Sequence, residues 1–241
     1  MSKNIIILQH IAIETPGYIL DLMKKDNFNL FTVELDEGEK IPENLNQFDG
    51  MLCMGGPMDT WMEDAYPWLI HEKKKIKEFV MDLKKPYLGF CLGCQLLGEV
   101  IGGDVVKSEP PEIGIMDINM QNSYQSDQLF SSFNKTIKAL QWHSYEVKNL
   151  ENNKDVSVIG SSPTTRYQIF KYKDHAYGIQ FHIEIKNDTV NQWGCVPEYE
   201  NALNESLGAG ALKKFDEDAQ KNMQSMNKNA ENLYYNFKNI L

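Results

Sequence analysis

The segment YLGFCLGCQLLGEVIGG, residues 87–103, constrains the fold more than any other part of the chain. A short apolar strand, residues 87–90, is expected to lead directly into Cys91, and residues 95–101 are expected to form the following helix. A residue at such a sharp strand-to-helix turn needs a strained backbone. The residues two positions before and two positions after it then lie in close contact. Gly89 and Gly93 occupy those positions and remove the clash. The pattern predicts a nucleophile elbow with Cys91 at its tip.

The first hundred residues alternate short apolar runs with helical patterns. We expect strands at residues 4–9, 30–35, 50–54 and 87–90, and helices at residues 18–25 and 67–83. This alternation predicts an α/β fold with a mostly parallel sheet and helices on both faces. Active sites in such sheets lie at the carboxyl ends of the strands, where Cys91 is expected.

The second half of the chain is richer in strands and ends in helix. Strands are expected at residues 104–106, 115–120, 136–141, 156–161, 167–172 and 176–181, with a hairpin turn at 173–175. Apolar residues at 223, 226, 230, 233, 237 and 240 predict an amphipathic terminal helix. We see no linker or repeat, and expect one domain over residues 1–241, with an α/β core over 1–186 and a helical tail over 187–241 packed on it.

The charge and hydropathy of the chain argue against nucleic-acid and membrane partners. The net charge is -10, which repels a phosphate backbone, and Arg166 is the only arginine available for bidentate phosphate contacts. The first apolar run, Ile5 to Leu8, is too short for a signal peptide or a membrane span. We therefore expect a cytoplasmic protein.

Cys91 and Cys94 also form a C-x-x-C pair, which in thioredoxin-like folds serves redox chemistry. That fold has no use for the two bracketing glycines, so a nucleophilic Cys91 is favoured and Cys94 is expected to pack under the elbow. The amino terminus of the following helix also favours a thiolate at Cys91. A zinc site needs four ligands and only two cysteines are close in sequence, so no metal is expected.

A cysteine nucleophile needs a general base, and the chain has five histidines. Three are expected elsewhere: on a surface helix, at the hairpin tip and on the rim of the first strand (His71, His175 and His10). His182 follows the last strand, and Glu184 is on the same side of an extended segment, where it can orient the imidazole. His143 is expected to have no such partner. His182 is therefore the predicted base.

Three motifs in this order resemble the class I glutamine amidotransferase family. They are Gly55-Gly56-Pro57, the G-x-C-x-G-x-Q run over residues 89–95, and His182-x-Glu184. The resemblance covers most of the chain and extends to four shorter matches: Tyr66-Pro67-Trp68, Gly102-Gly103, Glu112-Ile113-Gly114 and Trp142-His143.

The resemblance implies a flavodoxin-like sheet and hydrolysis of the side-chain amide of glutamine through a cysteine thioester, with no cofactor. Cys91 would be the nucleophile, His182 the general base and acid, and Glu184 the residue that orients it. The remaining implied site residues are Gly56 and Leu92, whose N–H groups would form the oxyanion hole, and Gln95, Ser144 and Tyr145, which would hold the substrate.

The sequence departs from the family at two places. Ile183 stands where proline is usual, which is expected to loosen the local backbone, and Ser144-Tyr145 replaces the usual glycine or histidine. The chain also lacks a G-x-x-x-x-G-K-[ST] phosphate loop and has no room for a synthetase half.

These features predict a free-standing enzyme that hydrolyses glutamine or a similar small γ-glutamyl compound. One alternative is a glutaminase subunit that supplies ammonia to a separate synthetase subunit. Another is a non-catalytic binding protein, which the intact Cys91, His182 and Glu184 disfavour.

Overall fold

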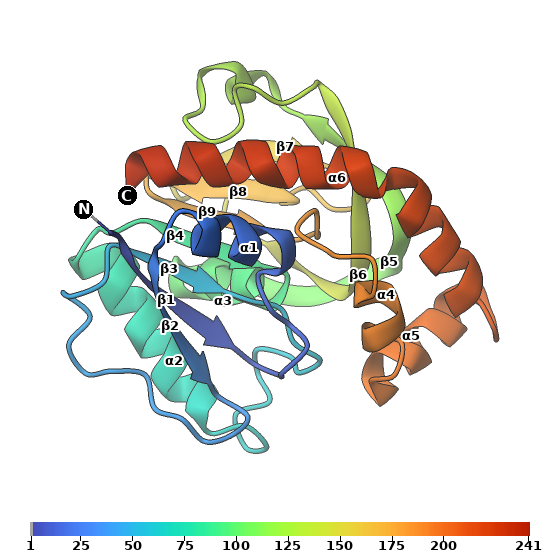
Figure 1. Cartoon of the computed structure of the whole chain (residues 1–241), viewed down its shortest axis with the longest axis horizontal. Coiled ribbons are helices and arrows are strands. Elements are labelled where there is room, and N and C mark those ends of the chain that lie inside the picture. Colours follow the sequence, from blue (N-terminus) through green and yellow to red (C-terminus); the bar gives the residue numbers. More distant parts are fainter. Residues whose placement is uncertain (1) are drawn as a thin grey trace.

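The computed structural model describes residues 2–241 (Figure 1). Its centre is a nine-stranded sheet with the order β2-β1-β3-β4-β9-β8-β7-β5-β6. The strands are β1 (Asn4–Gln9), β2 (Asn29–Glu34), β3 (Gly50–Cys53), β4 (Tyr87–Phe90), β5 (Asp104–Met120), β6 (Thr136–Lys148), β7 (Val156–Ser161), β8 (Ile169–Tyr172) and β9 (Ala176–Ile179).

The first part of the sheet is parallel and the second part is antiparallel. The pairs β2–β1, β1–β3, β3–β4 and β4–β9 are parallel, which gives the 2-1-3-4-5 order of a flavodoxin-like fold. The pairs β9–β8, β8–β7, β7–β5 and β5–β6 continue the sheet in antiparallel fashion. The predicted fold class is confirmed. The hairpin between β8 and β9 also forms where it was expected.

Helices cover both faces of the sheet. They are α1 (Gly17–Lys25), α2 (Trp68–Lys77), the π-helical turn η1 (Glu78–Asp82), α3 (Leu92–Val100), the 3₁₀ turn η2 (Asn122–Ser126), α4 (Thr189–Trp193), α5 (Pro197–Leu207) and α6 (Leu212–Ile240). Alternate residues of β1 face opposite ways: Ile5 and Ile7 belong to the core under α1 and α6, and Ile6 and Leu8 to the core under α2 and α3. A strand buried on both sides explains the unbroken apolar run in β1.

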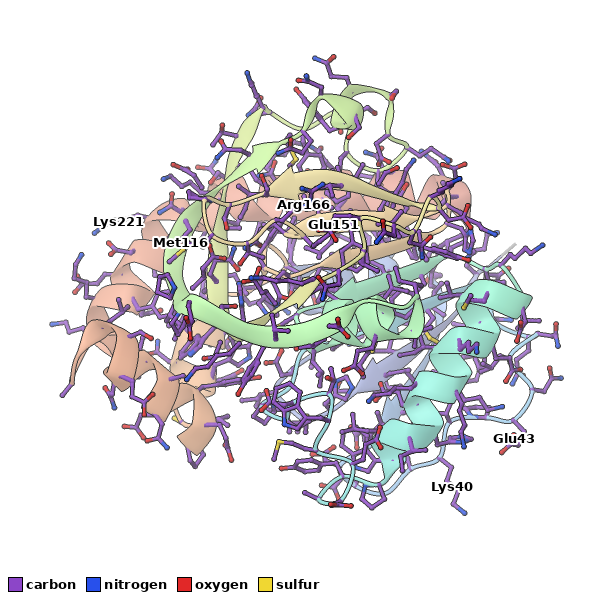
Figure 2. The ribbon with its side chains drawn as sticks, turned by 180° about the vertical axis from the view of Figure 1, so that it is seen from behind. Lys40, Glu43, Met116, Glu151, Arg166 and Lys221 are labelled. Atoms are coloured by element: carbon purple, nitrogen blue, oxygen red, sulfur yellow. The ribbon has the colours of Figure 1, made fainter. Side chains whose placement is uncertain are left out.

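Two antiparallel strands, β5 and β6, are longer than the sequence predicts, whereas β8 and β9 are each two residues shorter than the expected ranges 167–172 and 176–181. The expected strands at 104–106 and 115–120 are parts of one strand, β5, and β6 continues beyond the expected end at residue 141. The β5–β6 register shifts between Lys107 and Glu112, where two consecutive prolines (Pro110 and Pro111) lack the N–H groups that a ladder needs. Seen from behind, β5 curves across the molecule (Figure 2).

Two helices also differ from the predicted ranges. The helix expected over residues 67–83 divides into α2 and the π-helical turn η1. The elbow helix α3 begins at Leu92, directly after Cys91, and not at residue 95. This earlier start brings the amino terminus of α3 against the cysteine.

The helical tail packs on the sheet, and α6 lies along it beside α1 (Figure 1). The predicted apolar stripe of α6 is buried at Met223, Met226, Ala230, Leu233 and Phe237. Over residues 2–241, no helix has the length and apolar character that crossing a membrane requires.

Candidate active site

Cys91 has the strained backbone that the glycine pattern predicts. Its φ is 49° and its ψ is -102°, at the junction of β4 and α3. A Cβ on Gly89 would collide with the Gly93 carbonyl, and a Cβ on Gly93 would collide with the Cys53 carbonyl. Glycine is therefore required at both positions for the elbow to close.

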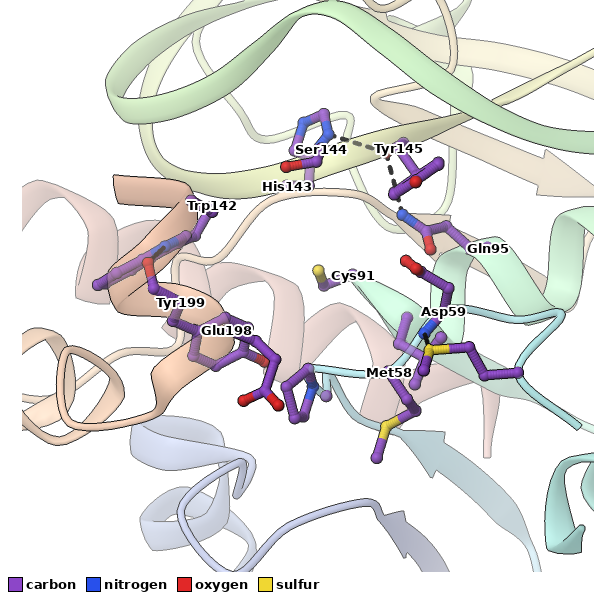
Figure 3. Close-up of a pocket in the computed structure, with 15 residues that line it drawn as sticks. Met58, Asp59, Cys91, Gln95, Trp142, His143, Ser144, Tyr145, Glu198 and Tyr199 are labelled. Atoms are coloured by element: carbon purple, nitrogen blue, oxygen red, sulfur yellow. Dashed lines mark hydrogen bonds between the residues drawn. The ribbon is translucent and has the colours of Figure 1, made fainter. Parts of the chain in front are cut away.

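Cys91 lines a cavity of about 290 Å³ (Figure 3). Cys91 is 8% exposed, whereas Cys94 is fully buried. All four cysteines are free. Burial, and the neighbouring Cys91, raise the pKa of Cys94 well above its ordinary value, so Cys94 is a poor nucleophile. The two thiols of the C-x-x-C pair therefore occupy different environments.

His182 and Glu184 form a buried pair just beyond the end of β9. His182 Nδ1 lies 2.6 Å from Glu184 Oε1, and the Ile183 N–H donates to Glu184 Oε2 at 2.9 Å. Burial alone would lower the pKa of His182, but the Glu184 charge and hydrogen bonds to Cys91 and Glu184 raise it well above its ordinary value. Glu184 therefore favours the protonated form of the imidazole.

The position of Ile183 differs from expectation. Instead of leaving the segment loose, Ile183 is fully buried and its N–H fixes the second oxygen of the Glu184 carboxylate. Proline, which has no N–H, could not make this bond. Trp193 of α4 also packs edge-on against the His182 ring at a centroid distance of 4.6 Å.

The residues expected to form the oxyanion hole border the same cavity as Cys91. Gly56 follows β3, and Leu92 opens α3. Within residues 2–241 neither backbone N–H is used in a hydrogen bond outside the regular elements, and the first N–H groups of a helix have no partner in that helix. Both donors are therefore available for an oxygen atom bound beside Cys91.

Gln95, Ser144 and Tyr145 line the cavity as well (Figure 3). The Gln95 side chain is engaged by the protein: its Nε2 donates to the Tyr145 carbonyl at 3.0 Å and to Gln180 Oε1 at 3.3 Å. Gln95 thus ties the elbow helix to β6.

Two expectations about the other histidines are wrong. His143 does have a carboxylate partner, because its Nε2 lies 3.1 Å from Glu112 Oε2, while its Nδ1 lies 2.9 Å from the Tyr145 carbonyl. His10 is fully buried and not on the rim. Its ring nitrogens lie 2.9 Å from the Gly55 carbonyl and 2.9 Å from Glu72 Oε1.

The sequence patterns missed three side chains near the site. The Tyr199 hydroxyl donates to Glu14 Oε1 at 2.6 Å, and burial raises the pKa of Glu14. Burial also raises the pKa of Asp59, a wall residue of the cavity, to about 6. None of the three belongs to a recognisable motif; the only available signal was the position of Glu14 and Asp59 just after two predicted parallel strands.

The comparisons with known proteins assign the chain to a family. A model of the glutamine amidotransferase class-I family matches residues 19–192. The chain belongs to the class I glutamine amidotransferase family.

Two relatives of this amidotransferase illustrate the range of the similarity. It is 24% identical over 220 residues to the glutamine amidotransferase-like protein YfeJ of Salmonella typhimurium, covering 90% of each chain. It is 31% identical over 153 residues to a subunit of the glutamine-hydrolyzing GMP synthase of Sulfolobus acidocaldarius, covering 62% of this chain and 74% of that one.

Solved structures share the fold of this amidotransferase along nearly its whole length. A glutamine amidotransferase of Thermotoga maritima superposes with a TM-score of 0.85 at 23% identity, covering 98% of both chains. A glutamine amido transferase of Methylobacillus flagellatus gives a TM-score of 0.85 at 23% identity, covering 100% of this chain and 96% of that one. The helical tail is therefore part of a fold found in other proteins.

Proposed function

We propose that this amidotransferase hydrolyses a small γ-glutamyl amide through a thioester on Cys91. The Cys91 sulfur attacks the γ-carbonyl carbon, and the thiol proton resides on His182. The oxygen of the tetrahedral intermediate accepts hydrogen bonds from the N–H groups of Gly56 and Leu92. The C–N bond then breaks as His182 protonates the leaving nitrogen, which departs as ammonia or an amine.

The second half of the reaction uses the same groups in reverse. His182, now neutral, removes a proton from a water molecule that attacks the thioester carbonyl. The C–S bond breaks, the glutamate product is released, and the Cys91 thiolate and His182 imidazolium are restored. Glu184 does not transfer a proton in this scheme; it holds the imidazole in position and stabilises its positive charge through the 2.6 Å contact.

The observation that supports independent action is the contribution of the helical tail to the cavity. Glu198, Tyr199 and Ala202 of α5 line the cavity together with Cys91 (Figure 3). These residues lie beyond the stretch matched by the family model, which ends at residue 192. The tail thus supplies part of the cavity wall within the same chain, and this supports a site that acts without a partner protein.

A second cavity supports a substrate larger than glutamine. It has a volume of about 680 Å³ and shares Ser144, Tyr145 and Ala202 with the first. Lys107 and Glu205 both lie in its wall and offer one positive and one negative charge to a bound molecule. Because Ser144 and Tyr145 are proposed to hold the amino-acid end of the substrate, the second cavity gives space for an extension of that end.

The second candidate function is a glutaminase subunit that delivers ammonia to a separate synthetase. The similarity to the GMP synthase subunit favours it. The two candidates differ in what the purified chain does alone. We expect turnover of at least one member of a panel containing glutamine, γ-glutamyl peptides and glutathione conjugates, and a γ-glutamyl adduct on Cys91 by mass spectrometry. Inactivity of the pure chain, followed by glutaminase activity on addition of cell extract, would favour the role in a synthetase.

A further inference from the structure

Three buried side chains beside the site have no part in the reaction described above. His10 follows β1, Cys53 ends β3, and Glu72 lies in α2; all three are fully buried. The His10 ring also packs near Trp68, at a centroid distance of 5.6 Å. A buried ionisable pair is costly to desolvate, so its contacts require a physical explanation.

The contacts of His10 fix where its protons lie. A carbonyl oxygen can only accept, so the Nδ1 that lies 2.9 Å from the Gly55 oxygen must carry a proton. Nε2 lies 2.9 Å from Glu72 Oε1. Burial alone would lower the pKa of His10, but the Glu72 charge and the hydrogen bonds to Glu72 and Gly55 raise it. His10 therefore donates from Nδ1 to the Gly55 carbonyl, and the contact with Glu72 favours a proton on Nε2 as well.

The acceptor of this hydrogen bond belongs to the peptide that carries an oxyanion-hole donor. The Gly55 carbonyl and the Gly56 N–H are the two ends of one peptide group, and in a trans peptide they point in opposite directions. Holding the oxygen on the His10 side turns the N–H away from His10. A peptide between two glycines has little side-chain restraint on its rotation, so an external anchor is needed.

The packing of Gly56 agrees with this arrangement. A Cβ at Gly56 would lie 2.9 Å from His10 Cβ and 3.2 Å from Leu92 Cδ2. Gly56 is thus enclosed between His10 and Leu92, the residue that supplies the other proposed oxyanion-hole donor.

We propose that His10, held by Glu72, is a positioning residue that anchors the Gly55–Gly56 peptide with its N–H directed at the oxyanion. This inference rests on the proposed function, because it assigns a role to a donor of that reaction. His10 touches neither the substrate nor Cys91 in this scheme. Its effect is confined to steps in which charge develops on the carbonyl oxygen of the substrate.

A metal site is the other use that these side chains suggest. One ligand atom each from His10, Cys53 and Glu72 lies within 4.8 Å of the others. However, both ring nitrogens of His10 are engaged in hydrogen bonds, and a structural zinc site takes four ligands. We therefore favour the hydrogen-bonded pair.

The test compares two conservative variants of His10. The amide nitrogen of asparagine can occupy the place of Nδ1, so His10→Asn keeps a donor for the Gly55 carbonyl. The amide nitrogen of glutamine corresponds instead to Nε2, so His10→Gln keeps only the contact with Glu72. Two rates are measured for each: acylation by the best γ-glutamyl substrate, and alkylation of Cys91 by iodoacetamide, which develops no oxyanion.

We expect His10→Gln to slow acylation by about 10- to 100-fold, less than the complete loss of an oxyanion-hole donor, with little change in KM. Alkylation by iodoacetamide should stay near the wild-type rate, and His10→Asn should recover most of the acylation rate. An unchanged acylation rate in His10→Gln, or a parallel loss of both rates, overturns the inference. Stoichiometric zinc in the purified wild-type protein overturns it as well. If wild type reacts with iodoacetamide but with no γ-glutamyl compound, the proposed function itself fails.

Discussion

The Ile183 N–H donates a hydrogen bond to the Glu184 carboxylate at 2.9 Å, in a position where the family usually has proline. The other oxygen of the same carboxylate contacts His182, so both oxygens are fixed by adjacent residues. The departure from the family pattern therefore adds a restraint on the proposed orienting residue.

Replacing Ile183 tests this restraint. Ile183→Pro removes the N–H, and Ile183→Val keeps it with a similar buried side chain. One hydrogen bond is worth about 1 kcal/mol, so we expect Ile183→Pro to lower kcat/KM by about fivefold and Ile183→Val to have little effect. Steady-state kinetics with the best substrate of the panel measures both. If Ile183→Pro were as active as Ile183→Val and wild type, the hydrogen bond would have no part in orienting Glu184.

The two cysteines of the C-x-x-C pair should behave differently. Cys91→Ala should abolish amide hydrolysis, because it removes the proposed nucleophile. Cys94→Ala should leave hydrolysis largely intact, since Cys94 is fully buried. Activity and mass spectrometry of both variants provide the measurement. Loss of activity in both variants, together with a reversible Cys91–Cys94 disulfide in wild type, would instead indicate redox chemistry.

His182 and Glu184 should contribute unequally. His182 transfers the proton, whereas Glu184 only orients the His182 imidazole. The loss of activity in His182→Ala should therefore be on the order of a hundredfold larger than in Glu184→Gln. Equal losses would contradict the orienting role. His143→Ala is the control, because both ring nitrogens of His143 are directed at Glu112 and Tyr145. If His143→Ala lost more activity than His182→Ala, His143 would be identified as the base.

The Glu184 charge also predicts a shift in the pH profile. It raises the pKa of His182, so the protonated imidazole persists to higher pH than usual and is lost as the pH rises through that pKa. In Glu184→Gln the pKa of His182 should fall, and the alkaline limb of kcat/KM should move to lower pH. An unmoved alkaline limb would mean that another group controls it.

The parts of the site that the sequence predicts depend on local patterns. The elbow follows from two glycines within two residues of Cys91, and the His182–Glu184 contact follows from i, i+2 spacing in an extended segment. The missed contacts join residues far apart: 31 positions separate His143 from Glu112, 62 separate His10 from Glu72, and 185 separate Tyr199 from Glu14.

The His143–Glu112 contact shows why such pairs escape local reasoning. Glu112 pairs with His143 across β5 and β6, directly after the register shift at the two prolines. The size of that shift decides which residue of β5 faces His143, and no periodicity within either strand encodes it.

The Glu112 carboxylate should stabilise the fold in a pH-dependent way. Burial would raise its pKa, but hydrogen bonds from His143, Ser162 and Thr164 outweigh burial and lower the pKa from 4.5 to about 2. A lowered pKa contributes stability that is present above pH 4.5 and is lost as the pH falls toward 2. By linkage the contribution is about 3 kcal/mol.

Urea unfolding at several pH values tests this contribution. The free energy of unfolding of Glu112→Gln should lie below that of wild type at pH 7, and the gap should narrow between pH 4.5 and pH 2. Asp174→Asn is a control at an exposed carboxyl, whose side chain is 76% exposed, and should show a much smaller gap. A gap for Glu112→Gln that does not change with pH would assign the loss to packing rather than charge.

The helical tail should be part of the same cooperative unit as the α/β core. We propose a single domain over residues 1–241, because Leu233 on α6 is fully buried in the core that also contains Ile5 and Ile7 of β1.

Leu233→Ala should lower the free energy of unfolding by about 2 to 5 kcal/mol. Tyr235, two residues away, is 41% exposed, so Tyr235→Ala should have a much smaller effect. Circular dichroism and tryptophan fluorescence, to which Trp142 beside Phe215 of α6 contributes, should report one shared transition. If the two probes instead reported two separate transitions, and Leu233→Ala shifted only the one at lower denaturant concentration, the tail would unfold independently of the core.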